Sequence, residues 1–282
     1  MRLARYHLDG RERLGAVLDD TVVPTPWPDF ETLFALADPL AAVRSFTPDP
    51  ADAVIPDRLL PPLARHAQVI GTGGNYADHA AEAARVGMEV VDPIFIPYLA
   101  GAVIGPDDNI VIPHPDTKTD YEVEFSVVIG RTASRLTLEN AMDHVFGYTV
   151  VNDISAREVM ERVKFQIMLL KSPDTFLPVG PHVVTVDEIP DPYRLGIATY
   201  LNGEVRQKSN TGAMTWRIPE LLVKITHYCT LRPGDVVTTG TPGGVGYFRD
   251  PPEFLHPGDT IVAEVEGVGR LSNGLVAGWS DG

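Results

Sequence analysis

One stretch decides the fold: Asp120-Tyr121-Glu122-Val123-Glu124-Phe125-Ser126-Val127-Val128-Ile129. Its early residues alternate between apolar and acidic, which is the pattern of a β-strand with two different faces. Glu122 and Glu124 therefore point the same way, about 7 Å apart along the strand. Carboxylates this close raise each other's pKa unless a cation lies between them, and oxygen ligands favour Mg²⁺, Mn²⁺ or Ca²⁺. A solvated outer face is the alternative, because the pair alone is a weak signal.

Two further residues can join this pair. Asp153 follows the apolar run 148–152, which predicts a buried strand with a third carboxylate at its end. Capping of the following helix is the alternative role for Asp153. Lys171 ends another apolar run, where a partly desolvated ammonium can stabilise an oxyanion or an enolate. A lysine that snorkels to water from a helix end is the ordinary explanation.

An alanine-rich segment at residues 76–85 predicts a helix that Asn75 caps and Gly87 ends. His79 and Glu82 are three positions apart on it, so they share one face and can form a hydrogen bond. A carboxylate partner raises the basicity of an imidazole, which suits a general base acting on water. The alternative is an exposed surface pair that contributes little energy.

A glycine-rich loop follows a predicted strand near the end of the chain. It reads Thr238-Thr239-Gly240-Thr241-Pro242-Gly243-Gly244-Val245-Gly246. Its backbone N–H groups and hydroxyls can hold a substrate carboxylate. It lacks the Gly-Lys-Ser/Thr ending of a phosphate-binding loop, so it predicts no nucleotide site, and a plain connecting loop is the alternative.

Most of the remaining chain is predicted to be β-structure, with a domain boundary near residue 64. Before it, three short strands with tight turns and one helical segment are followed by a proline-punctuated stretch. This predicts a small N-terminal β domain, 1–64, and a larger domain, 65–282; a proline-rich loop inside one domain is the alternative. The predicted strands are residues 3–8, 14–18, 21–23, 69–71, 109–112, 121–129, 148–152, 197–201, 236–239 and 260–266. The predicted helices, besides 76–85, are residues 30–42, 138–144, 156–165 and 218–228.

The composition restricts the class of protein. The net charge of −15 argues against a nucleic-acid surface, which needs clustered lysine and arginine. No apolar run approaches the roughly 20 residues of a membrane-spanning helix, so we expect a soluble protein. The polar N-terminus and the single Cys229 favour a reducing, cytoplasmic setting. An anionic substrate would need local positive charge against this overall field.

Six stretches of the chain resemble the fumarylacetoacetate hydrolase family, from about residue 66 to the C-terminus. They occur in one order, and chance convergence on all six is implausible. They are residues 74–82, 120–124, 147–157, 171–181, 202–207, and 231–235 running into 239–242. The resemblance implies an α+β, predominantly β fold, with mixed sheets in a roll and a small N-terminal β domain, and it also implies a homodimer.

The resemblance also implies a site. Mg²⁺ or Mn²⁺ would be bound by Glu122, Glu124 and Asp153, with Ca²⁺ as a substitute in crystals. His79 and Glu82 would activate water, and Lys171 would stabilise developing negative charge. The residues implied to contact the substrate are Arg157, Gln207, Thr241 and Tyr76. The chain departs from the family in two places. In the stretch 92–101, where many relatives have a lysine, it has Tyr98, and Gly73-Gly74 replaces a more usual apolar residue. These departures affect the expected substrate more than the expected metal site.

The reaction expected from this site is metal-dependent hydrolysis of a C–C bond in a 2,4-dioxo acid or related β-diketone, through an enolate. Oxaloacetate decarboxylation, 2-oxo acid isomerisation and hydration are alternatives, because they need the same enolate. A non-catalytic β module stabilised by Ca²⁺ is a distant alternative, since it leaves Lys171 and the glycine-rich loop unexplained. The expected partner is a small anionic 2-oxo acid, and neither nucleic acid nor membrane is expected.

Overall fold

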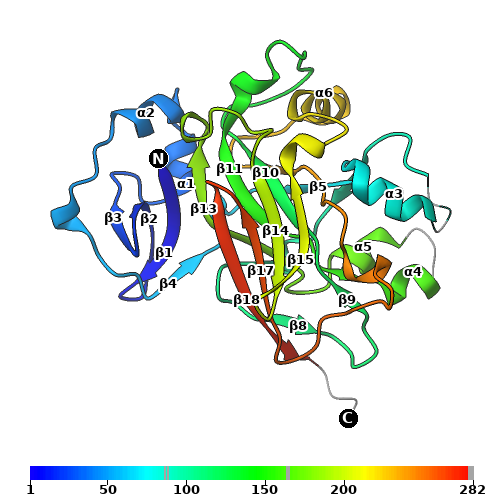
Figure 1. Ribbon diagram of the computed structural model, residues 1–282. Helices are drawn as coiled ribbons and strands as arrows, with labels where there is room; N and C mark the ends of the chain where they lie inside the picture. The colour runs from blue at the N-terminus through cyan, green and yellow to red at the C-terminus, as the bar shows by residue number, and fades with distance from the viewer. Residues whose placement is uncertain (86, 88, 163–165, 279–282) are drawn as a thin grey trace.

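The computed structural model describes residues 1–85, 87, 89–162 and 166–278, and its main feature is a large mixed sheet (Figure 1). The strands of this sheet are β1 (Arg2–Leu8), β2 (Arg11–Leu18), β3 (Thr21–Pro24), β4 (Arg58–Leu60), β5 (Val69–Gly73), β6 (Ile94–Pro97), β7 (Val103–Ile104), β10 (Val123–Ile129), β11 (Val145–Asn152), β13 (Leu177–Thr185) and β16 (Val236–Thr238). Their order is β3-β2-β1-β13-β11-β10-β16-β5-β6, with β4 beside β1 and β7 beside β13. Most neighbours are antiparallel, whereas β16–β5 and β13–β7 are parallel.

A second sheet lies across the middle of the first and closes the main core (Figure 1). It has the order β15-β14-β17-β18-β8. Its strands are β8 (Ile110–Ile112), β14 (Gly196–Leu201), β15 (Glu204–Asn210), β17 (Thr260–Val265) and β18 (Gly269–Ala277). Buried Phe125 and Tyr148 of the large sheet share a hydrophobic cluster with Ile197 and Leu271 of the second sheet. A short ladder joins β9 (Thr119–Asp120) to β12 (Ser155–Ala156).

Helices cover the ends and flanks of the sheets. The α-helices are α1 (Phe30–Phe34), α2 (Pro39–Ser45), α3 (Ala77–Arg85), α4 (Glu158–Arg162), α5 (Ile167–Lys171) and α6 (Ile218–Tyr228). Single 3₁₀ turns are η1 (Pro50–Asp52), η2 (Ala100–Ala102), η3 (Ala141–His144), η4 (Val186–Glu188), η5 (Thr211–Ala213) and η6 (Gly246–Phe248). Figure 1 shows α3, α4 and α5 gathered at one side of the sheets. No helix in the described ranges is long and apolar enough to cross a membrane. The predicted α+β, predominantly β fold is confirmed.

The N-terminal strands extend the large sheet. β1 pairs antiparallel with β13, with Leu3 opposite Val183. Leu3 and Phe30 also share a buried cluster with Phe146 of β11. The first 64 residues therefore share both hydrogen bonds and core with the rest of the chain, and the predicted division at residue 64 stays a prediction.

Several predicted elements differ from the structure. The helix predicted at 30–42 is broken in two, because Asp38 caps a new helix that begins at Pro39. The helix at 138–144 is the short turn η3. The helix at 156–165 begins at Glu158, and its last three predicted residues lie outside the described ranges. Asn75 does not cap α3, because its side chain bonds to Trp216 and Thr239 instead. The strands that were not predicted are β4, β6, β7, β9, β12, β13, β15 and β18.

Candidate metal centre

Three acidic side chains meet where two paired strands end, and we call them the acidic triad: Glu122, Glu124 and Asp153. Glu122 precedes β10, Glu124 lies on it, and Asp153 follows β11. The antiparallel ladder sets Glu124 opposite Val151, and the N–H of Asp153 donates to the carbonyl of Glu122 at 2.8 Å. Each residue offers one carboxylate oxygen, and the three oxygens lie within 4.8 Å of one another. The structure thus brings the three predicted ligands together.

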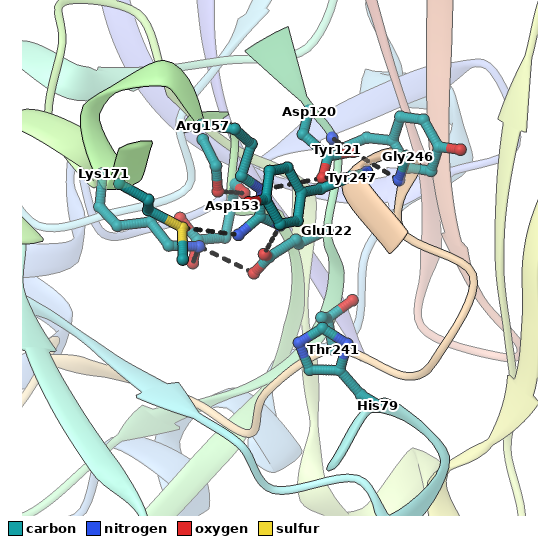
Figure 2. Close-up of polar contacts among 12 residues, drawn as sticks. His79, Asp120, Tyr121, Glu122, Asp153, Arg157, Lys171, Thr241, Gly246 and Tyr247 are labelled. Atoms are coloured by element: carbon teal, nitrogen blue, oxygen red, sulfur yellow. Dashed lines mark hydrogen bonds and ion pairs between the residues drawn. The ribbon is translucent and has the colours of Figure 1, made fainter. Parts of the chain in front are cut away.

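Two buried cations contact the triad (Figure 2). Lys171 Nζ lies 2.8 Å from Glu122 Oε2 and 2.6 Å from Asp153 Oδ2. Arg157 Nη2 bonds to Glu122 Oε1, and Arg157 Nε lies 2.9 Å from Asp120 Oδ2. Lys171 and Arg157 are each only 5% exposed. Lys171 therefore does not snorkel to solvent. Its burial beside the triad supports the other interpretation, an ammonium that can stabilise an oxyanion or an enolate.

Burial and charge act differently on the three carboxylates. Burial raises the pKa of Glu122, but the positive charges of Lys171 and Arg157 outweigh it and lower that pKa to about 2. Burial also raises the pKa of Asp153, to about 6, although Lys171 opposes the shift. Burial and the charges of Asp153 and Glu122 raise the pKa of Glu124 well above its usual range. The triad therefore resists carrying its full negative charge without a further cation.

The donor set fits a hard divalent cation. All three candidate ligands are carboxylates, which are the ligands that Mg²⁺, Mn²⁺ and Ca²⁺ prefer. With every group ionised, the triad and Asp120 carry four negative charges, and Lys171 and Arg157 carry two positive charges. Asp153 Oδ1 is buried and has no hydrogen-bond partner among the described residues. A divalent cation would balance the charge and could occupy the unpaired oxygen.

The predicted His79–Glu82 pair is formed and lies next to the triad. His79 Nδ1 lies 3.3 Å from Glu82 Oε2, and Glu82 Oε1 accepts a hydrogen bond from Gly244 N at 2.8 Å. The His79 ring packs against Phe248 at 5.7 Å between centroids. Figure 2 shows His79 across the site from Glu122. These side chains are largely buried, with 13% and 18% exposed, so the alternative of an exposed surface pair is wrong.

The predicted substrate contacts fall into two groups. Arg157 and Thr241 lie at the site (Figure 2). Gln207 stands behind Thr241: its Nε2 donates to Thr241 Oγ1 at 2.8 Å, and its Oε1 accepts from Val123 N at 3.1 Å. Tyr76 is fully buried in the main hydrophobic cluster. Direct substrate contact by Gln207 and Tyr76 stays a prediction, and the observed contacts give Gln207 a supporting position behind Thr241.

Asp120 is a residue of this site that the sequence did not single out. Its carboxylate accepts hydrogen bonds from Arg157 Nε at 2.9 Å, Gly246 N at 2.7 Å and Tyr247 N at 3.1 Å (Figure 2). A Cβ on Gly246 would lie 1.9 Å from the carbonyl oxygen of Glu253, so only glycine fits there. Asp120 therefore ties Arg157 to the loop that carries Phe248. In the sequence, only its position two residues before Glu122 could have drawn attention to Asp120. That position does not reveal its partners.

A cavity of about 360 Å³ adjoins the His79–Glu82 pair. Its lining mixes aromatic rings and charges, from Glu82, Arg85, Lys118, Glu161, Tyr247, Phe248, Arg249, Pro252 and Phe254. A larger apolar cavity of about 690 Å³ lies between β5, β6 and α6. No predicted site residue is among its described lining residues, so the smaller cavity is the one connected with the predicted chemistry.

Comparison with known proteins agrees with this geometry. A family model described as fumarylacetoacetate (FAA) hydrolase C-terminal matches residues 68–276. The chain belongs to the fumarylacetoacetate hydrolase family. Its relatives in this family include the Bos taurus protein named oxaloacetate tautomerase FAHD2A, mitochondrial. The two are 44% identical over 218 residues, which are 77% of this chain and 69% of the relative.

Solved structures of family members resemble the whole chain. A fumarylacetoacetate hydrolase from Exiguobacterium antarcticum has a TM-score of 0.80 and 35% identity, covering 98% of this chain and 99% of the other. A maleylpyruvate hydrolase from Sphingobium sp. SYK-6, in complex with manganese(II) and pyruvate, has a TM-score of 0.76 and 27% identity, covering 99% and 100%. The named activities of these relatives are enzymatic, and the buried acidic triad of this chain is a candidate divalent-metal site.

Proposed function

We propose that this fumarylacetoacetate hydrolase family member is a metal-dependent enzyme that interconverts the keto and enol forms of an oxaloacetate-like 2-oxo dicarboxylic acid. The observation that carries the proposal is the buried acidic triad, which lies between two cations and a paired histidine. The name of the bovine relative, an oxaloacetate tautomerase, supports the same reaction class. Proton transfer at the carbon beside a 2-oxo group needs a base and stabilisation of the enolate oxygen.

The acidic triad would hold Mg²⁺ or Mn²⁺. The manganese and pyruvate in the Sphingobium hydrolase support a divalent cation that binds with a 2-oxo acid. When bound, such a cation supplies Lewis-acid stabilisation of negative charge on the 2-oxo oxygen. The protein contributes a buried, oxygen-only donor set for it.

His79 would move the proton. The carboxylate of Glu82 would accept the hydrogen bond from His79 Nδ1, so Nε2 is the nitrogen that remains for the substrate. Gly244 N fixes the other oxygen of Glu82 at 2.8 Å, which holds the pair in one orientation. The substrate proton would pass to His79 Nε2 and return from it to carbon or oxygen, so no atom is gained or lost overall.

Lys171 and Arg157 would hold the anion. Both are buried against the triad, where the low dielectric strengthens their interaction with negative charge. Because the whole chain carries a net charge of −15, these placed cations and the metal would provide the attraction that the overall field lacks.

Hydrolytic C–C cleavage of an acylpyruvate-like 2,4-dioxo acid is the second candidate. The same His79–Glu82 pair could direct a water molecule to the distal carbonyl, and the hydrolase names of two structural neighbours favour this reaction. Decarboxylation of oxaloacetate and hydration would use the same enolate, and substrate assays separate them by their products.

The test follows each reaction on the same preparation with Mg²⁺. Exchange of the C3 protons of oxaloacetate in D₂O, read by NMR, measures tautomerisation, and pyruvate release from acylpyruvates measures hydrolysis. We expect His79→Ala to slow exchange by about 10²-fold or more, as for loss of a general base. His256→Ala, which removes an exposed histidine from a turn, is the matched control and should leave the rate unchanged.

Two outcomes would reject the proposal. Exchange at the uncatalysed rate with Mg²⁺ present, or at the wild-type rate in His79→Ala, would exclude the tautomerase assignment. Acylpyruvate hydrolysis that is much faster than proton exchange would favour the second candidate. EDTA should abolish whichever activity is found.

The assembly and compartment also remain proposals. A homodimer would double the mass of 30.7 kDa, which light scattering measures directly. The bovine relative is named as mitochondrial, whereas the sequence features favour the cytoplasm. Cell fractionation with an antibody to the native protein distinguishes the two compartments.

A further inference from the structure

A tyrosine hydroxyl lies at the metal centre without a role in the chemistry described so far. Tyr98 directly follows β6, and its backbone N–H donates to the carbonyl of Val69 at 3.3 Å. Its side chain turns inward, and its hydroxyl oxygen is buried with no hydrogen-bond partner among the described residues. A buried donor without a partner is unfavourable, so its presence calls for an explanation.

An unpaired acceptor lies beside this donor. Asp153 Oδ1 is likewise buried and has no partner within the described part of the chain, although Lys171 holds Oδ2 at 2.6 Å. The side chains of Tyr98 and Asp153 lie within hydrogen-bonding reach of each other, although neither oxygen has a partner of regular hydrogen-bond geometry among the described residues. A donor and an acceptor that both lack partners therefore lie at the same edge of the acidic triad.

The neighbouring strand makes room for the phenol. Gly71 of β5 lies against the Tyr98 ring, where a Cβ atom would come within 2.5 Å of the hydroxyl oxygen and 2.8 Å of Cε2. Any larger residue at position 71 would displace the ring. Gly71 thus leaves the space that the phenol occupies.

We propose that Tyr98 is a positioning residue of the metal centre, whose hydroxyl donates a hydrogen bond to Asp153 Oδ1 and orients that carboxylate for cation binding. The inference rests on the proposed metal site. Each carboxylate oxygen has two lone pairs, so Oδ1 can accept from the phenol and still face a cation. Partners that orient metal ligands in this way contribute strongly to affinity.

The test measures Mn²⁺ affinity by isothermal titration calorimetry, with electron paramagnetic resonance of bound Mn²⁺ as a second readout that does not depend on turnover. We expect Tyr98→Phe to weaken Mn²⁺ binding about tenfold and to change the resonance of the bound ion. Tyr6→Phe is the matched control, because Tyr6 also has a buried hydroxyl without a partner among the described residues but belongs to the N-terminal strands. Its Mn²⁺ affinity should equal that of the wild type.

Gly71→Ala provides an independent variant. It should weaken Mn²⁺ binding when Tyr98 is present, because the ring must move, and it should add little in the Tyr98→Phe protein, where the hydroxyl is already gone. Wild-type affinity in Tyr98→Phe, or fully additive losses in the double variant, would overturn the role of Tyr98 while leaving the metal site intact. A wild-type protein that does not bind Mn²⁺ would instead reject the proposed metal site, and this inference with it.

Discussion

Asp120 and the acidic triad are neighbouring acidic groups that differ in how fully the protein compensates their negative charge. Asp120 is fully buried, and its two oxygens accept four hydrogen bonds, from Arg157 Nε and from the backbone N–H groups of residues 121, 246 and 247. In the triad, by contrast, Asp153 Oδ1 is unpaired among the described residues, and the pKa of Glu124 is raised by burial and by the other two carboxylates.

This difference distinguishes a carboxylate that supports the fold from carboxylates that are available to bind a ligand. A buried carboxylate whose lone pairs are all used is part of the folded scaffold, because the protein itself compensates its desolvation. Buried carboxylates that the protein leaves under-compensated are costly to keep, and such sites are expected where a ligand completes the interactions. Asp120 should therefore matter to the fold, and the triad should matter to the cation.

The largest effect on stability should come from Asp120→Asn. The change removes the charge that faces Arg157 and replaces one acceptor oxygen by an NH₂ group. That group cannot accept a hydrogen bond, so either the bonds from Tyr121 N and Gly246 N or those from Arg157 Nε and Tyr247 N are lost. Breaking a buried ion pair on one side costs about 3–5 kcal/mol. Urea unfolding of the metal-free protein should show this loss, whereas Asp116→Asn, at an exposed position in the loop before β9, should leave stability unchanged. A loss below 1 kcal/mol would contradict the framework role.

The sequence predicted the triad better than it predicted Asp120. Alternation along one strand and an apolar run before Asp153 are local patterns, so they indicate three carboxylates near strand ends without knowledge of the fold. The partners of Asp120 are distant in sequence: Arg157 is 37 positions away and Gly246 is 126 away. No local pattern records such contacts.

The difference between local patterns and contacts distant in sequence also explains which secondary-structure predictions were wrong. The meander β1–β3 and helix α6 carry clear periodicity and were predicted near their observed bounds. Strand β13 contains Pro178, Gly180 and Pro181, which read as loop signals, yet pairing with β1 and β11 holds it in the sheet. Asn75 is a residue type that often caps helices, but its side-chain amide donates to the carbonyls of Trp216 and Thr239 instead. Tertiary contacts, which local sequence patterns do not record, therefore determine the structure of β13 and of Asn75.

The next largest effect should be on metal affinity. Glu124→Gln keeps the size of the side chain and its contact with Gly240 N, but it removes one anionic ligand from the triad. Changes to groups that only orient ligands cost about 10–100-fold in affinity, so loss of a ligand should cost at least about 100-fold. Titration calorimetry with Mn²⁺ measures this, and Glu266→Gln, outside the triad, is the control. Equal affinities for Glu124→Gln and wild type would remove Glu124 from the site.

Glu124→Gln should also have a smaller, stabilising effect on the metal-free protein. Ionised Glu124 is destabilising there, because burial and the charges of Asp153 and Glu122 oppose its ionisation. Glu124→Gln should therefore stabilise the metal-free protein by about 0.5–2 kcal/mol, the usual range for a single stabilising substitution. Thermal unfolding in EDTA checks the sign. Destabilisation would mean that the triad is compensated as fully as Asp120, and the comparison between them would fail.

The smallest effect should come from a charge pair outside the core. Glu264 and Arg270 face each other directly across β17 and β18, with Arg270 Nη1 3.0 Å from Glu264 Oε2, close to the distances at the triad. Their side chains are 36% and 59% exposed, so water already compensates both charges and screens their attraction. Arg270 also keeps its contact with the Tyr200 ring at 5.2 Å. Glu264→Gln should therefore cost less than about 1 kcal/mol in urea unfolding and leave Mn²⁺ affinity unchanged. A loss as large as that of Asp120→Asn would show that burial is not what distinguishes these acidic groups.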